Sequence, residues 1–366
     1  YAELVENRSF EYEKSLDSWK IEKSNTTGPA VEIREESTTD SQVKVCSDNP
    51  LNSNNPNYVE LNIDITIVSD LLTLETVSLT KGYEYITING LSQIDKVLFQ
   101  KLKENGVKYV ASRCVGYNHM DVNAAKELGI RLSHGTYSPN NVADFAVMLM
   151  LMLIRKVKIS MGRSNVNDFS LNDLQGREMK DLTIGVIGTG KIGSTVVKNL
   201  SGFGCRTIAY ARHPNENLKG IVEYVDLESI YRESDIITLH MSLTDGNYHI
   251  INNDTISRMK DGVIIINTAR GGLVNTQDLI VGLETGKIGA AGIDTYEDEE
   301  GICHFNHNVS MVGHREMFYL KQFPNVILTQ HYAFFTDHAV SDMVESALCS
   351  LNAFSKNLSN ACEIIV

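Results

Sequence analysis

The sequence predicts an α/β fold built from two doubly wound parallel-sheet domains with a cleft between them. The chain has 366 residues, and at about 150 residues per domain this length favours two domains. Short apolar, β-branched segments alternate with amphipathic segments along most of the chain, and glycines often separate them. This alternation is typical of βα units, in which each helix carries the chain back across a parallel sheet.

The first part of the chain predicts a polar insertion followed by βα units. Residues 1–23 are expected to contain the end of a strand and a helix, and residues 24–58, rich in Ser, Thr, Asn and Pro, a long loop or partly ordered insertion. After these, the expected elements in chain order are a strand at 62–68, a strand at 83–90, a helix at 93–106 ended by Gly106, a strand at 108–117, a short helix at 121–129 capped by Asp121 and ended by Gly129, and a strand at 130–135.

The second part of the chain predicts one long helix and a second βα series. Ser138 and Pro139 begin the helix, whose Met/Leu face in "VADFAVMLMLMLI" (142–154) is expected to pack against another subunit or domain. The expected strands that follow are one with a glycine loop and helix at 182–204, one at 205–211, three that run into loops at 236–244, 263–274 and 288–301, and a last one at 325–334. The expected helices are at 225–235, 253–262, 276–287 and 337–354.

Bulk composition excludes several classes of partner. The net charge of −13 argues against nucleic acid, because phosphate binding needs a basic face. The longest apolar run, 142–154, is shorter than the about 20 residues that span a bilayer, and it contains Asp144. The N-terminal residues lack the blocks of a signal peptide, and the six cysteines are scattered. We therefore expect reduced thiols, no membrane contact and a cytoplasmic protein.

A glycine pattern lies between an apolar strand and a helix in "GVIGTGKIG" (185–193). Gly188 permits a tight turn, Gly190 lets a pyrophosphate approach the backbone, and Gly193 lets helix and strand pack closely. Lys191 and Ile192 complete the loop, and the free N–H groups of the helix N-terminus favour an anion there. This context predicts a dinucleotide site.

The next strand ends without the carboxylate that usually binds the adenosine ribose. Ala211 stands at that position, and Arg212 and His213 follow it. A ribose 2′-hydroxyl needs an acceptor, whereas a 2′-phosphate needs cations and excludes a neighbouring carboxylate. We expect NADP(H) or NAD(H) as the cofactor, with NADPH tolerance favoured; the alternative is that Arg212 is a solvated surface residue and the cofactor is NAD.

Three polar residues follow strands of the second series: Arg270, Glu299 and His331. Ligands of open α/β sheets bind at the carboxyl ends of the strands. Arginine can bind a carboxylate with two hydrogen bonds, histidine can give a proton to a developing alkoxide, and a carboxylate beside the histidine favours its protonated form. The set suits a keto acid. A metal site in "CHFNH" (303–307) with His314 is not expected, because the spacing completes no four-ligand pattern.

Together these motifs resemble the D-2-hydroxyacid dehydrogenases over roughly residues 83–355. The matching segments include "YSPNNVADFAV", "LTIGVIGTGKIG", "MKDGVIIINTARGGLV", "GIDTYEDEEG" and "FPNVILTQHYAFFTDHAV". The long segment between the last two resembles the D-lactate dehydrogenase branch. The neutral residue and arginine at 211 and 212 are similar to the D-lactate dehydrogenases of vancomycin-resistance systems, which tolerate NADPH.

The resemblance implies a flavodoxin-like catalytic domain (1–137 with 334–366), a Rossmann nucleotide-binding domain (138–333), and a homodimer through the helix that starts near Ser138. The resemblance also implies roles for single residues. For catalysis, Arg270 would orient the substrate, His331 would be the acid/base, and Glu299 rather than Glu297 would keep His331 protonated. For binding, Val115 and Gly116 would offer N–H groups to the substrate carboxylate, Tyr137 and Phe334 would line the substrate pocket, His240 would face the nicotinamide, and Asp294 would hold the nicotinamide carboxamide.

The leading hypothesis is reduction of a small 2-keto acid to its D-2-hydroxy acid, with pyruvate to D-lactate as the best guess. Larger acids such as 2-ketoisocaproate or phenylpyruvate are the alternative within this class. A different class, a nucleotide-sensing corepressor on the same fold, would bind peptides and need no turnover.

Overall fold

A computed structural model describes residues 30–34, 42–46, 58–62, 64–68 and 70–365. The chain divides into two compact units, one of Pro139–Phe335 and one of Tyr1–Ser138 with Thr336–Val366. The two boundaries lie one or two residues from those expected from the sequence. In the sequence, the unit of residues 139–335 is therefore inserted between the two segments of the other unit.

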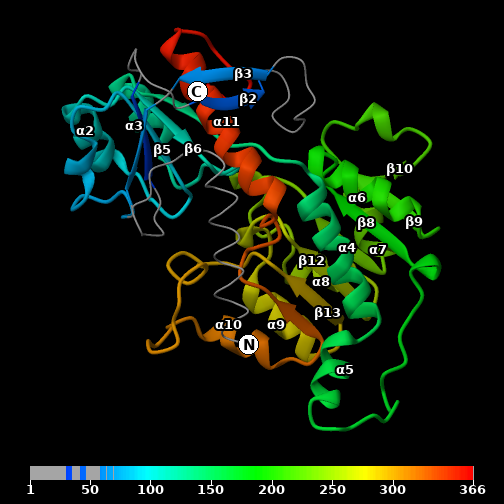
Figure 1. Cartoon of the computed structure of the whole chain (residues 1–366). Coiled ribbons are helices and arrows are strands. Elements are labelled where there is room, and N and C mark those ends of the chain that lie inside the picture. Colours follow the sequence, from blue (N-terminus) through cyan, green and yellow to red (C-terminus); the bar gives the residue numbers. More distant parts are fainter. Residues whose placement is uncertain (1–29, 35–41, 47–57, 63, 69, 366) are drawn as a thin grey trace. The chain divides into compact units, whose positions relative to one another are not determined.

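The unit of residues 139–335 is built on a seven-stranded parallel sheet (Figure 1). The strand order is β10-β9-β8-β11-β12-β13-β14, so the order reverses between β8 and β11, the point where open α/β sheets bind ligands. The strands are β8 (Thr183–Ile187), β9 (Arg206–Tyr210), β10 (Glu223–Tyr224), β11 (Ile236–Leu239), β12 (Val263–Asn267), β13 (Ile288–Ile293) and β14 (Val326–Leu328). The Rossmann prediction is confirmed.

Helices cover both faces of this sheet, because its strands are apolar on both sides. Along β12, Ile264 and Ile266 pack with the core under α4 and α6, whereas Ile265 packs with the core under the helices of the other face. The helices of the unit are α4 (Asn140–Ile154), α5 (Val157–Ser164), α6 (Lys191–Ser201), α7 (Leu227–Glu233), α8 (Asn253–Arg258), α9 (Thr276–Glu284) and α10 (Arg315–Gln322).

The segment expected to form one long helix from Ser138 forms two helices, α4 and α5. Pro139 stands at the N-cap position of α4, and the break comes at Arg155 and Lys156, where Lys156 has a left-handed backbone (φ 52°). Such a conformation cannot continue an α-helix. None of the helices among the described residues is long and apolar enough to cross a membrane.

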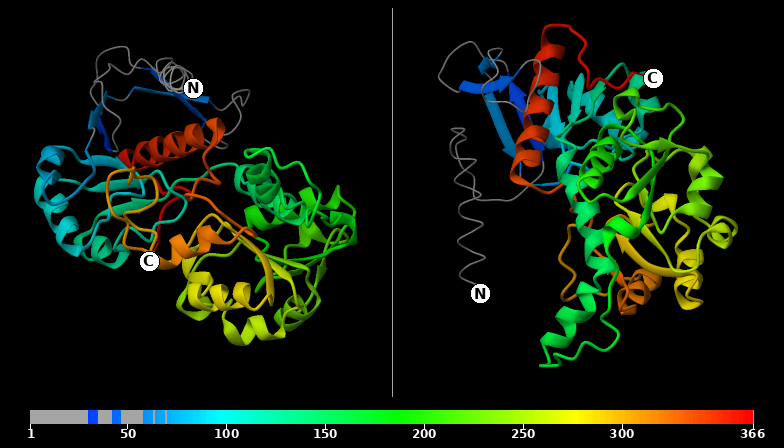
Figure 2. Two further views of the ribbon diagram at one scale, coloured as in Figure 1. Left: turned by 90° about the horizontal axis from the view of Figure 1, so that it is seen from below. Right: turned by 90° about the vertical axis from the view of Figure 1, so that its right-hand side faces the viewer.

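The other unit holds a five-stranded sheet in the order β4-β1-β5-β6-β7. Strands β5 (Tyr85–Ile88), β6 (Tyr109–Ser112) and β7 (Arg131–Ser133) are parallel, as expected. Helices α2 (Lys96–Asn105) and α3 (Val122–Leu128) pack on one face, and α11 (Asp337–Ser355) packs on the other (Figure 2). Asp121 caps the start of α3, and the left-handed residues Gly106 and Gly129 end α2 and α3, as the sequence predicts. Helix α2 begins after the N-cap Asp95, later than the expected start at residue 93.

Of the two expectations for 24–58, a long loop or a partly ordered insertion, the loop is wrong for two segments, because strands β1 (Ala30–Arg34) and β2 (Gln42–Cys46) lie there. β1 runs antiparallel to both β4 (Asp64–Val68) and β5, so this sheet is not entirely parallel. β2 pairs with β3 (Tyr58–Asn62) in a separate two-stranded sheet. Each segment alternates apolar and polar residues, a strand signal that the surrounding Ser, Thr and Asn obscure. The helix expected within 1–23 lies outside the described residues.

Candidate active site

The glycine loop joins β8 to α6, and the surroundings of its three pattern positions, Gly188, Gly190 and Gly193, explain why a glycine stands at each. Gly188 has a left-handed backbone (φ 96°), and a Cβ there would lie 2.5 Å from the carbonyl oxygen of His240. A Cβ on Gly193 would lie 1.9 Å from the carbonyl oxygen of Gly188. Gly190, the N-cap of α6, has no atom within 4 Å of its Cβ position. The loop therefore leaves open backbone at the helix N-terminus, which fits the pyrophosphate of a dinucleotide.

The first helical residues of α6 lie beside this open backbone. Lys191 is exposed and Ile192 is half-buried. Thr189, within the loop, accepts a hydrogen bond from the hydroxyl of Tyr224 at 2.9 Å, and that hydroxyl accepts one from the backbone N–H of Asn215 at 2.9 Å. Tyr224 thus ties the segment after β9 to the glycine loop. The sequence contains no signal for it, because the contact depends on how β10 pairs with β9.

The segment after β9 leaves two basic side chains accessible. Ala211 is half-buried, and Arg212 and His213 are exposed. Within the part of the chain that the structure describes, neither side chain has a hydrogen-bond or ion-pair partner. The arginine fork is therefore available to a ligand phosphate, and no carboxylate occupies the position after the strand.

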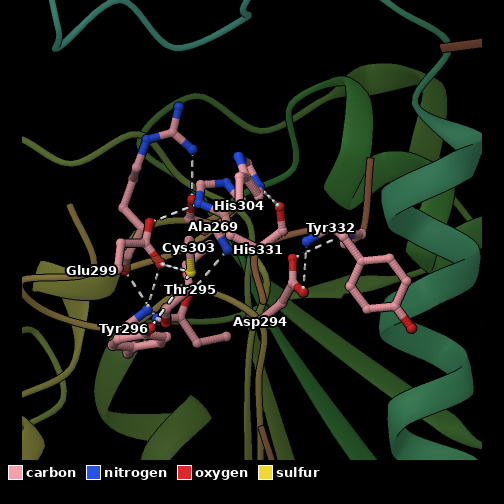
Figure 3. A network of polar contacts seen from close by, with 12 residues as sticks. Ala269, Asp294, Thr295, Tyr296, Glu299, Cys303, His304, His331 and Tyr332 are labelled. Atoms are coloured by element: carbon pink, nitrogen blue, oxygen red, sulfur yellow. Dashed lines mark hydrogen bonds and ion pairs between the residues drawn. The ribbon is translucent and has the colours of Figure 1, made fainter. Parts of the chain in front are cut away.

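His331 and Glu299 form a close pair at the ends of β14 and β13 (Figure 3). Nδ1 of His331 lies 2.6 Å from Oε1 of Glu299. A carboxylate only accepts hydrogen bonds, so Nδ1 carries the proton and Nε2 is left to exchange one with a substrate. The other carboxylate oxygen accepts from the backbone N–H of Tyr296 at 3.2 Å, which orients Glu299. The contact with Glu299 therefore fixes the orientation of the His331 ring.

The backbone of His331 is itself unusual. Its φ is 55°, a left-handed conformation that costs a non-glycine residue about 1–2 kcal/mol. Buried Asp294 holds the following turn, because its carboxylate accepts from Tyr332 N at 3.1 Å, from Ala333 N at 3.0 Å and from the Thr329 hydroxyl at 2.5 Å. The structure thus gives Asp294 a role within the protein, as support for the His331 turn; a contact with a nicotinamide carboxamide stays a prediction.

Arg270 follows β12 and caps a short 3-10 helix, Gly271–Leu273. It is half-buried, and its Nη1 donates to the carbonyl of Ala269 at 2.6 Å. Asn267 donates to the carbonyls of Arg270 at 2.9 Å and Thr295 at 3.2 Å, which joins this turn to the segment after β13. Arg270, Glu299 and His331 therefore follow the three neighbouring strands β12, β13 and β14.

Glu297 has a different set of partners from Glu299. Its Oε1 lies 2.5 Å from Nε2 of His249, and its Oε2 accepts from both the N–H and the hydroxyl of Thr276. Burial alone would raise the pKa of Glu297, but hydrogen bonds from His249 and Thr276 outweigh it and hold the pKa below its usual range. The structure thus brings Glu299, and not Glu297, to His331.

His240 lies directly after β11, beside the glycine loop. Burial lowers the pKa of His240 to about 3. Its Nε2 lies 2.8 Å from the hydroxyl of Thr238. Burial therefore favours the neutral form of this ring.

The three histidines at 304, 307 and 314 each contact a different group. His304 Nε2 lies 2.8 Å from the carbonyl of His331, His307 Nδ1 lies 3.1 Å from Ser310 Oγ, and His314 caps α10. Among the described residues there is no group of three or more His, Cys, Asp and Glu side chains that could hold a metal. His304 is not among the site residues expected from the sequence; its side chain is exposed, and its contact with the His331 carbonyl appears only in the structure.

The remaining predicted residues lie in both units. Val115 is exposed and Gly116 half-buried in the loop after β6, and Tyr137 is half-buried after β7. These positions follow the carboxyl ends of their strands, where the loop after β6 is held by Ser112 Oγ, which accepts from Cys114 N at 3.2 Å. Phe334 belongs to the other unit, with its ring 6.4 Å from that of His331.

Comparison with known proteins places these features in one family. Residues 147–333 match the family described as D-isomer specific 2-hydroxyacid dehydrogenase, NAD binding domain. The chain is 44% identical over 292 residues to an "Aromatic 2-oxoacid reductase" of Clostridium sporogenes, covering 79% of this chain and 88% of that one. It is 37% identical to a "D-specific alpha-keto acid dehydrogenase" of Enterococcus faecalis, covering 80% and 90%.

Solved structures agree. The D-lactate dehydrogenase of Escherichia coli superposes with a TM-score of 0.72 at 36% identity, covering 81% of this chain and 91% of that one. A D-2-hydroxyisocaproate dehydrogenase gives a TM-score of 0.74 at 34% identity, with the same coverage of 81% and 91%. The chain therefore belongs to the D-isomer-specific 2-hydroxyacid dehydrogenases, oxidoreductases with a Rossmann domain that binds a nicotinamide cofactor.

Proposed function

We propose that this enzyme reduces a 2-keto acid to the D-2-hydroxy acid with NADH or NADPH, with pyruvate as the first choice of substrate. The observation that carries the proposal is the His331–Glu299 pair at 2.6 Å with Arg270 on a neighbouring strand end. A nicotinamide cofactor held at the glycine loop would supply the hydride for the keto carbon. His331 supplies the proton for the resulting alkoxide, and Arg270 binds the substrate carboxylate.

Larger 2-keto acids are the alternative substrates. The name of the Clostridium sporogenes relative refers to aromatic 2-oxoacids, and that of the Escherichia coli structure to D-lactate. The test is a steady-state assay with pyruvate, 2-ketoisocaproate and phenylpyruvate, each with NADH and with NADPH. We expect turnover of at least one acid, with pyruvate the most efficient; no turnover of any of them would reject the proposal.

We further propose that the enzyme accepts NADPH through Arg212 and His213. Both side chains are exposed beside the segment that Tyr224 ties to the glycine loop. The double change Ala211→Asp with Arg212→Ile is expected to lower kcat/KM for NADPH by about 10- to 100-fold, because it removes charge-assisted hydrogen bonds and adds a repelling carboxylate. It should raise kcat/KM for NADH, since aspartate can accept from the ribose hydroxyl.

A matched control for this cofactor change is Arg232→Ile, which removes an exposed arginine of α7 whose partner is Glu233. Kinetics with both cofactors should stay within about twofold in this control, because distant exposed charges are screened. Unchanged NADPH kinetics in the double variant would mean that the 2′-phosphate is recognised elsewhere.

We also propose a homodimer through α4. The inner face of this helix lies in the core, yet Met148, Leu151 and Met152 on its other side line an open hollow with Phe203. A helix that is apolar on both sides needs a packing partner for its second side. We expect light scattering to give the native enzyme a mass twice the 40.7 kDa of one chain.

A charge in this hollow should separate the subunits. In Met148→Asp the mass is expected to fall toward that of one chain, because the carboxylate would be buried at the interface. Val281→Asp makes the same kind of change at an exposed position of α9, on the opposite face of the sheet, and should leave the mass unchanged. A monomeric native enzyme, or a Met148→Asp variant that keeps the native mass, would contradict this assembly.

A further inference from the structure

The peptide group between His331 and Tyr332 is held at both ends by side chains (Figure 3). Its N–H, from Tyr332, donates to Oδ1 of Asp294 at 3.1 Å. Its carbonyl, from His331, lies 2.8 Å from Nε2 of His304. The plane of this peptide group determines ψ of His331, a residue whose φ is already left-handed at 55°. Strained backbone of this kind persists only where surrounding contacts determine it.

We propose that His304 is a positioning residue that holds His331 in the orientation needed for proton transfer. A carbonyl oxygen only accepts, so Nε2 of His304 must carry a proton. Both the neutral tautomer with a proton on Nε2 and the cation can donate this bond, which therefore survives a change in the charge of His304. This inference rests on the proposed role of His331 and adds a residue to it.

A single loop contacts both the imidazole ring and the backbone carbonyl of His331. Glu299 binds the imidazole ring, and His304, five residues later in the same loop, binds the backbone carbonyl. Between them, the N–H groups of Ile302 and Cys303 both donate to the carbonyl of Glu299, at 3.0 and 3.1 Å. Cys303 is buried and its Sγ lies 3.5 Å from the hydroxyl of Tyr296. The turn is therefore fixed, and it sets the distance between its two contacts with His331.

Rings also surround His331 on the side of His304. The His304 and His331 rings have centroids 6.0 Å apart, and the His304 and Phe334 rings meet edge to face at 6.1 Å. Loss of the His304 donor leaves this peptide group held only through its N–H bond to Asp294. The ψ angle of His331 is then less tightly fixed, and its ring is expected to shift relative to Glu299. The effect on the reaction therefore comes through His331, the residue that His304 contacts.

The test compares His304→Phe, which keeps a ring but removes the donor, with His304→Gln, which keeps a donor. For 2-keto acid reduction, His304→Phe is expected to lower kcat by about 10- to 100-fold, the cost of misplacing a reacting group by about 1 Å. Because the weakened Glu299 contact stabilises the imidazolium less, the pH above which kcat/KM declines should move to lower values. His304→Gln should recover part of both losses.

His307→Phe is the matched control, since His307 lies in the same loop and its Nδ1 contact is with Ser310. It should leave the pH profile and kcat within about twofold of the native values, because the contact of His307 with Ser310 does not involve His331. An unmoved pH profile in His304→Phe would overturn the proposal whatever the change in kcat, and so would equal changes in His307→Phe. Failure of the proposed function is distinguishable, because the native enzyme would then reduce no 2-keto acid.

Discussion

His331→Gln is expected to lower kcat for 2-keto acid reduction by about 10²- to 10⁴-fold, the usual contribution of a general acid. Glutamine is close in size and can still donate to Glu299, but it has no proton to give to an alkoxide at neutral pH. Binding of the cofactor should be unaffected, because His331 follows β14 whereas the glycine loop follows β8. The measurement is steady-state kcat with saturating pyruvate, beside a fluorescence titration with NADH.

His307→Gln is the control for this change, because it makes the same substitution in the neighbouring loop. It should retain native kcat and NADH affinity. Native-like turnover in His331→Gln would remove the acid/base role from this residue, and the Glu299–His331 contact at 2.6 Å would then be structural.

Arg270→Gln is expected to lower kcat/KM for the 2-keto acid by about 10²- to 10³-fold. The guanidinium is the group we assign to the substrate carboxylate, and removing one partner of a desolvated charge pair costs about 2–5 kcal/mol. Most of the loss should appear in KM for the keto acid, with KM for NADH nearly constant. Arg270→Lys should recover only part of the loss, because lysine keeps the charge but not the planar fork.

Arg232→Lys on α7 serves as the control for Arg270→Lys, since its side chain is 65% exposed. An Arg270→Gln variant with native KM for every 2-keto acid would show that another cation binds the carboxylate. A loss confined to NADH affinity would instead mean that Arg270 acts on the cofactor.

The Rossmann unit could be predicted from sequence because its signals are local. Runs such as "VIIIN" are apolar at every position, and all five residues of β12 are buried between two layers of helices. Glycines and capping residues then mark where strands and helices end. The residues at the ends of β12, β13 and β14 were found for the same reason, since parallel strands bring their carboxyl ends to one edge.

The parts that could not be predicted depend on contacts between distant segments. β1 pairs with β4 and β5, far along the chain, and no local pattern identifies those partners. The break at Lys156 follows no glycine or proline. Tyr224, His304 and the supporting role of Asp294 appear only once the turn after β14 and the pairing of β10 are known. No local sequence pattern identifies a side chain whose role is to position another residue.

The most direct test of the account is chiral analysis of the product formed by the native enzyme from pyruvate and from phenylpyruvate with NADH. We expect only the D-2-hydroxy acid, in an amount equal to the NADH consumed, and at least about 10²-fold less product from His331→Gln in the same time. Formation of the L-acid or a racemate, or NADH oxidation without hydroxy acid, would contradict the roles assigned to Arg270, Glu299 and His331.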